Sequence, residues 1–250
     1  YNIIDSLFVA KIGEDAITAL SLVYPVQNLI NALAIGFGVG INAVISYHLG
    51  AGEIDKADAA ATRGIACSVV HGVVSMIVCI TVMPRFLRLF TDSEQVAEMG
   101  TQYASIAFVF SVIIMVGLAF EKIYQAMGRM QVTMTALLFG CVTNIVLDPL
   151  FIFALNMGVR GAALATIISQ CLSCVWVLRF LTGPKTLLRL KKENIRLAPR
   201  LILPCVALGT ATFIMQASES VISVCFNSSL LKYGDDIAVG AMTILSSVMQ

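Results

Sequence analysis

A single carboxylate stands inside a long apolar stretch of the sequence. The segment TNIVLDPLFIF, residues 143–153, contains Asp148, and no other charged residue occurs between Met130 and Val159. Asn144 lies four residues before it, so the two side chains project from the same face of a helix. This pair predicts a titratable group that is held away from water, where a carboxylate could exchange an ion or a proton.

Two further acids, Asp5 and Glu219, also lie within apolar stretches. A charged residue at the centre of a membrane-spanning helix costs about 2.5–3.5 kcal/mol on insertion scales. Such residues normally face the protein interior and mark the path of an ion or a substrate. The alternative is a structural role, in which each buried acid ties neighbouring helices together by hydrogen bonds.

Composition indicates the kind of scaffold that must position these acids. The 250-residue chain is 58% hydrophobic and only 12% charged, whereas soluble domains carry roughly 25% charged residues. Its apolar residues form long uncharged runs, and about 20 such residues suffice to span a bilayer. We therefore expect an all-α, polytopic membrane bundle. The expected helical segments are 1–10, 17–47, 64–84, 99–120, 130–155, 161–180, 201–231 and 237–250.

The basic residues indicate an orientation in the membrane. Eleven of the sixteen Lys and Arg residues fall on joints that share one side, if the segments alternate in direction. The side richer in Lys and Arg is normally cytoplasmic. The longest and most basic joint, residues 183–200, is therefore expected to be a cytoplasmic linker. Because the chain starts at Tyr1 and stops within an apolar run, we interpret it as a piece of a longer protein.

A short internal repeat divides the chain. At an offset of 221 residues, the segment from Lys11 to Asp15 (KIGED) matches the segment from Lys232 to Asp236 (KYGDD). Duplicated six-helix halves recur in secondary transporters. The repeat predicts a first lobe over residues 1–182, the linker over 183–200, and the start of a second lobe over 201–250.

Two glycines in the second segment predict helix packing rather than ligand binding. Gly36 and Gly40 have the GxxxG spacing that lets helix backbones approach closely. A phosphate-binding loop is excluded, because no strand precedes the glycines and no Lys-Ser/Thr follows them. The seven cysteines lie in apolar stretches without a matching metal-ligand cluster. We expect no cofactor and no nucleic-acid partner.

Four stretches together resemble the multidrug and toxic compound extrusion (MATE) family, and its prokaryotic DinF-like branch in particular. They are IIDSLFVAKIGEDAITALSL (3–22), ALAIGFGVGINAVISYHLGAGEIDKA (32–57), YQAMG (124–128) and NIVLDPLFIF with GVRGAALATIISQ (144–170). The resemblance implies twelve helices in two six-helix lobes, with the first lobe and the opening of the second present here. It also implies export of amphiphilic, often cationic compounds, driven by inward flow of Na⁺ or H⁺.

The resemblance further implies which residues act. By position in the family pattern, Asp5, Asn144, Asp148 and Thr166 become the cation-coupling site, and Glu219 becomes a substrate-binding residue. Two carboxylates, an amide and a hydroxyl supply hard oxygen ligands suited to Na⁺. The same carboxylates could instead carry a proton, because burial favours the neutral form of an acid.

Other functions remain as alternatives. A lipid-linked oligosaccharide flippase of the same superfamily should have more cationic residues in its spans. A membrane-embedded enzyme should show paired catalytic acids or DDxxD clusters, and no span contains them. A receptor is possible on span number alone, but the repeat argues against it. We therefore expect a transporter rather than an enzyme, monomeric and multi-pass in the cell membrane, whose partners are its small-molecule substrate and the lipid bilayer.

Overall fold

The computed structural model describes residues 7–9, 11–91, 93–181, 188, 190 and 199–233. The regular elements within these residues are all helical. They are α2 (Glu14–Gly50), α3 (Ile54–Phe90), α4 (Glu94–Val109), α5 (Ser111–Ala126), α6 (Met130–Pro149), the π-helix η1 (Leu150–Ala154), α7 (Val159–Leu181) and α8 (Pro199–Tyr233).

The expected all-α membrane bundle is confirmed. Within the described part of the chain, four helices are long and apolar enough to cross a membrane, and a fifth span results if the bent pair α4–α5 counts as one. The helices α2 and α3 have 37 residues each. At 1.5 Å per residue each is about 55 Å long, so both must project beyond a hydrocarbon core of about 30 Å.

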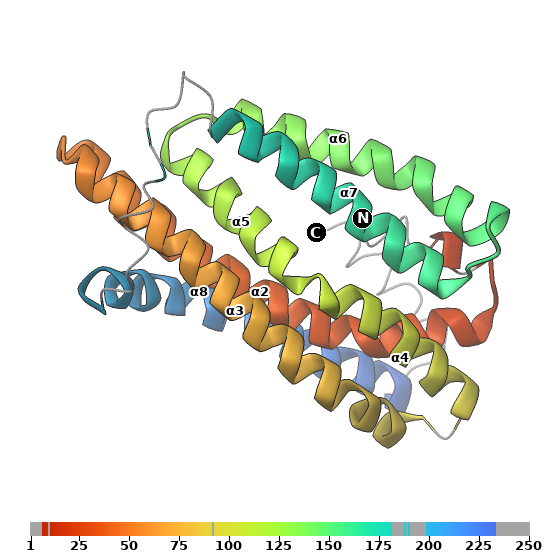
Figure 1. Ribbon diagram of the computed structural model, residues 1–250. Coiled ribbons are helices and arrows are strands. Elements are labelled where there is room, and N and C mark those ends of the chain that lie inside the picture. Colours follow the sequence, from red (N-terminus) through yellow and green to blue (C-terminus); the bar gives the residue numbers. More distant parts are fainter. Residues whose placement is uncertain are drawn as a thin grey trace.

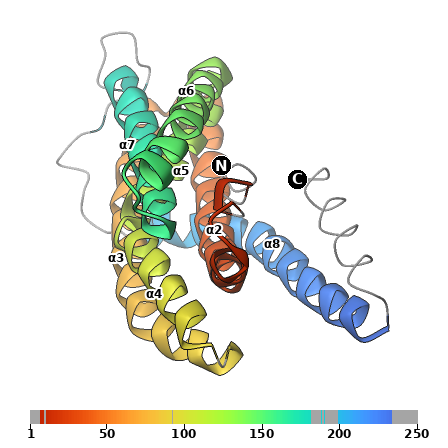
Figure 2. The ribbon, with the colours of Figure 1, turned by 90° about the vertical axis from the view of Figure 1, so that its right-hand side faces the viewer.

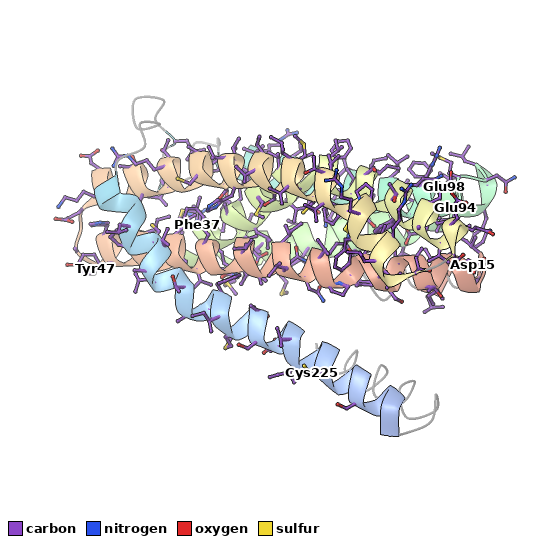
Figure 3. All side chains as sticks on the ribbon, turned by 90° about the horizontal axis from the view of Figure 1, so that it is seen from below. Asp15, Phe37, Tyr47, Glu94, Glu98 and Cys225 are labelled. Carbon is purple, nitrogen blue, oxygen red and sulfur yellow. The ribbon has the colours of Figure 1, made fainter. Side chains whose placement is uncertain are left out.

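The helices run back and forth between two ends of the bundle (Figure 1). The joints α2–α3 and α5–α6, the end of α7 and the start of α8 lie at one end, and the joints α3–α4 and η1–α7 lie at the other. Asp15, Glu94 and Glu98 lie at one of these ends, and Tyr47 lies at the other (Figure 3).

The expected single segment over residues 99–120 is broken in the structure. At Phe110 the chain bends by 48°, which separates α4 from α5. Ser111 stabilises the bend, because its hydroxyl proton is shared between the carbonyl of Phe108 at 2.8 Å and that of Gly72 in α3 at 3.1 Å. The first of these bonds satisfies a carbonyl near the helix break, and the second joins the bend to its neighbour.

Apolar side chains fill the interior and also cover the outer surface. One buried cluster includes Leu20, Leu87 and Phe108, and a second includes Ile41 and Ile123. On the outer faces of α3 and α6, large apolar side chains recur at spacings of three or four residues and are exposed: Val70, Val74, Ile77, Met134, Leu138 and Val142. A helix that exposes such a face is compatible with lipid rather than with water.

The helix α8 crosses α2 at close range and then leaves the bundle. A Cβ at Gly36 would lie 2.8 Å from the Cβ of Phe213, and a Cβ at Gly40 would overlap the carbonyl oxygen of Cys205. Gly209 in α8 lies against the carbonyl of Gly36. The later turns of α8, which carry Cys225, diverge from the other helices (Figures 2 and 3).

Candidate cation site

The paired residues of α6 meet a threonine of α7. The amide nitrogen Nδ2 of Asn144 donates to Oδ1 of Asp148 at 3.1 Å and to Oγ1 of Thr166 at 3.3 Å. The four-residue spacing in α6 places Asn144 and Asp148 one above the other. Asn144 therefore connects the carboxylate of its own helix to the hydroxyl of the next.

This cluster is shielded from solvent. Asn144 and Asp148 are both 0% exposed, and the oxygens Asn144 Oδ1 and Asp148 Oδ2 are inaccessible. Thr166 is half-buried. The two helices approach closely because small residues line the first half of α7, among them the buried Gly161, Ala162, Ala163 and Ala165. Such residues bring helix backbones together in membrane proteins.

Among the other predicted site residues, those that the structure describes lie outside this cluster. Asp5 lies outside the described residues. Glu219 is exposed and belongs to α8, between the crossing with α2 and the diverging end of that helix. Gly36 and Gly40 form the α2 side of that crossing, so they lie on a packing surface and not in the polar cluster.

A small cavity adjoins the cluster through Thr166. Its volume is about 60 Å³, and α2, α4, α5 and α7 enclose it. Several of its lining side chains are uncharged and polar: Gln27, Asn31, Tyr103, Ser111, Thr166 and Gln170. About 10–15 Å³ of such cavity space suffices for one water molecule, so the cavity has room for water. Water held by these polar side chains could hydrate a cation next to the site.

A larger cavity of about 350 Å³ continues from the small one and shares Asn31, Ile114 and Gln170 with it. Glu121 lines this second cavity. Its Oε1 accepts hydrogen bonds from Lys122 Nζ at 3.2 Å and from Gln125 Nε2 at 2.9 Å. Glu121 and Lys122 are neighbours in α5. Here they form a half-buried charged pair beside a cavity.

Sequence reasoning missed the polar lining of both cavities. The runs are defined by the absence of charge, so the uncharged residues Gln27, Tyr103 and Gln170 do not interrupt them. One signal was present: Gln27 and Asn31 have the same four-residue spacing as Asn144 and Asp148, which places them on one face of α2.

The donor set decides which ligand the cluster suits. Among the described residues, no group of three or more His, Cys, Asp and Glu side chains could hold a metal ion. The cluster supplies one carboxylate, one amide and one hydroxyl. Hard oxygen donors with a single negative charge fit a monovalent cation such as Na⁺, or a proton on the carboxylate, better than a transition metal.

A buried carboxylate within a bundle of lipid-compatible helices is typical of a membrane transporter, since intramembrane acids mark ion and substrate paths. The family model described as MatE matches residues 1–150. The chain belongs to this family, the multidrug and toxic compound extrusion transporters.

Two multidrug export proteins are similar to this chain over nearly its whole length. The multidrug export protein MepA of Staphylococcus haemolyticus is 24% identical over 94% of this chain, and that of Staphylococcus aureus strain NCTC 8325 is 25% identical over the same share. Each alignment covers 52% of the relative. The chain thus spans about half the length of the curated relatives it matches.

Solved transporters of the same superfamily share the fold. An outward-facing multidrug resistance MATE transporter matches with a TM-score of 0.92 and 26% identity, over 100% of this chain and 55% of its own. An inward-facing MATE transporter matches with a TM-score of 0.89 and 27% identity, over 97% and 56%. A transporter from Pyrococcus furiosus, described as having a binding pocket of reversed polarity, matches with a TM-score of 0.92 and 26% identity, over 100% and 55%.

Proposed function

We propose that this chain forms the cation-coupling half of an antiporter that exports amphiphilic, often cationic compounds. The inward flow of Na⁺ or H⁺ drives export, and Asp148 is the residue that exchanges the ion. The names of the staphylococcal relatives support the export of drugs. The observation that carries the coupling proposal is the fully buried Asp148, joined through Asn144 to Thr166.

The mechanism follows from the cost of burying charge. An empty, ionised Asp148 has lost the hydration that it would have in water, so Na⁺ or a proton stabilises the arrangement of α6 and α7 in which it binds. Asn144 keeps the carboxylate and Thr166 at a fixed spacing. Asp5, in the first expected segment 1–10, is proposed to complete the site. Release of the ion then favours a second arrangement, and a ligand shifts such an equilibrium only by its different affinities for the two states.

The remaining predictions belong to the same proposal. Residues 1–182 form the first lobe, residues 201–250 open the second, and the basic linker 183–200 faces the cytoplasm of a cell whose membrane holds the protein as a monomer. The divergence of α8 from the bundle supports the division into lobes. Glu219 faces the central cavity between the lobes and attracts cationic substrates.

Transport by the full-length protein in inside-out membrane vesicles tests the proposal. Vesicles should accumulate ethidium, an amphiphilic cation, when a Na⁺ or pH gradient is imposed, and should not do so without a gradient. Glu219→Gln should reduce accumulation of ethidium more than that of a neutral substrate. Accumulation that needs no gradient would contradict cation coupling, and an equal loss for both substrates would contradict the role of Glu219.

A further inference from the structure

The helix that carries Asp148 changes its winding directly after this residue. Pro149 has no N–H, so the carbonyl of Ile145 receives no helical hydrogen bond from it. The next five residues, Leu150–Ala154, form the π-helix η1, and its wide turn closes with a 3.0 Å bond from the Leu155 N–H to the Leu150 carbonyl. Single π-turns often occur at functional sites.

The first turn of α7 packs directly on this wide turn. A Cβ at Gly161 would lie 2.8 Å from the carbonyl carbon and oxygen of Phe151 and 3.0 Å from the nitrogen of Ile152. Ile152 and Val159 flank this contact and are 3% and 5% exposed. The contact therefore joins backbone to backbone, with no flexible side chain that could yield.

Along the chain, this contact lies between the two halves of the polar cluster, because Phe151 follows Asp148 and Gly161 precedes Thr166. Thr166 follows Gly161 by five residues on α7, which is about 7.5 Å along a helix. Asn144 and Asp148 lie in the last turns of α6, before η1 begins. The distance between α7 and η1 thus sets the distance between Thr166 and the pair in α6.

The cluster has little room for a change in this distance. The bond between Asn144 and Thr166 is already 3.3 Å long, at the upper end of the range for N–H···O bonds. The Cβ of an alanine at position 161 would lie 2.8 Å from the carbonyl group of Phe151, whereas ordinary contact begins at 3.4 Å. The backbones of α7 and η1 would therefore have to separate by about half an ångström. A shift of that size that moves α7 away from α6 breaks the hydrogen bond between Asn144 and Thr166.

We propose that Gly161 and the π-turn after Pro149 are positioning residues for the cation site, which fix the spacing of Thr166 from Asn144 and Asp148 and thereby set the affinity for the coupling ion. The inference rests on the proposed function of this cluster. Neither Gly161 nor Pro149 supplies a ligand to the ion. Both residues affect the spacing of the ligands through the backbone of η1.

The test compares Gly161→Ala with Gly117→Ala in the full-length protein, reconstituted in proteoliposomes. Gly117 lies within α5, and a Cβ there meets nothing within 4 Å. Ethidium transport is measured against NaCl at constant ionic strength, with choline chloride as replacement, and against pH without Na⁺. Gly161→Ala should raise the half-saturating Na⁺ concentration about tenfold, the lower range for residues that orient ion ligands. If the coupling ion is H⁺, the midpoint of the pH profile should shift instead.

Ethidium binding, measured by fluorescence without a gradient, should keep its affinity in Gly161→Ala, and Gly117→Ala should match wild type in every measurement.

Pro149→Ala provides an independent variant if Gly161→Ala does not fold. It restores an N–H for the Ile145 carbonyl, so the π-turn can rewind and the ion response should shift as it does in Gly161→Ala. Unchanged Na⁺ and pH responses in the folded variants would overturn the positioning role. A full ion response in Asp148→Asn would overturn the proposed function itself.

Discussion

Two helix contacts in the bundle are built from different chemistry. Between α6 and α7, polar side chains at fixed hydrogen-bonding distances join Asn144, Asp148 and Thr166. Between α2 and α8, the backbones meet at Gly36, Gly40 and Gly209, and apolar atoms surround them. Hydrogen bonds fix distance and direction, whereas small residues let helix backbones approach closely. The first contact suits recognition of an ion, and the second suits close packing of two helices.

The largest effect is expected at the α2–α8 crossing. Gly40→Ala places a Cβ onto the carbonyl of Cys205, so the helices must separate, and overpacking of this kind costs about 1–3 kcal/mol. The thermal midpoint in detergent, measured by the fraction of monodisperse protein after heating, should fall clearly below that of wild type. Gly117→Ala serves as the matched control. A Gly40→Ala protein as stable as this control would show that the crossing is not tightly packed.

Removal of the central amide should weaken ion binding without unfolding the bundle. Asn144→Ala deletes the bonds to Asp148 and Thr166 together, and loss of a group that orients ion ligands typically costs 10–100-fold in affinity. The half-saturating Na⁺ concentration, or the pH midpoint for H⁺, should move by about this factor. Asn42→Ala removes a bond to the Lys122 carbonyl outside the site and should leave the ion response as in wild type. Equal effects of the two variants would contradict a special role of Asn144.

The hydroxyl of Thr166 should contribute less than the amide. A single hydrogen bond contributes about 1 kcal/mol net, so Thr166→Ala should weaken the ion response about fivefold. Thr166→Ser retains the hydroxyl and should restore most of it. If serine and alanine behave alike, packing of the methyl group rather than the hydroxyl explains the position.

The smallest effect concerns the turn between α2 and α3. The hydrogen bond from Lys56, and to a smaller extent the one from His48, lowers the pKa of Glu53 below its ordinary value of 4.5. The charged form is therefore favoured by folding, so its contribution to stability is fully present above about pH 4.5 and is lost as pH falls through the lowered pKa. Glu53→Gln should unfold slightly earlier than wild type at pH 7, and this difference should vanish in more acidic buffer. A difference that grows on acidification would contradict the assignment.

Much of the fold follows from the sequence because membrane burial removes charge. The uncharged runs indicated the long helices, and the four-residue spacing of Asn144 and Asp148 predicted that they share a face. The bend at Phe110 had no such signal, since neither proline nor glycine lies there and a bond from Ser111 to α3 stabilises it. Pro149 was visible but gave no indication of the π-helix, while Pro25 leaves α2 continuous. Such differences depend on neighbouring helices, which local sequence does not encode.

The contact with Thr166 illustrates the same limit for the site. Spacing within α6 paired two residues, but only the family resemblance suggested a threonine twenty-two positions after Asn144. Its proximity depends on how closely α7 packs on η1, through backbone atoms around Gly161. Interhelical distance is a property of packing, so the hydropathy pattern carries no information on it.

The central claim is that Asp148 couples the ion to transport, and Asp148→Asn tests it most directly. This variant keeps the size of the side chain and one acceptor oxygen but removes its charge. Ethidium binding and ethidium transport are measured with the same proteoliposomes, with a Na⁺ gradient, with a pH gradient and with neither. We predict wild-type ethidium affinity and a rate that no gradient increases. Transport by Asp148→Asn that either gradient still accelerates as in wild type would contradict the claim.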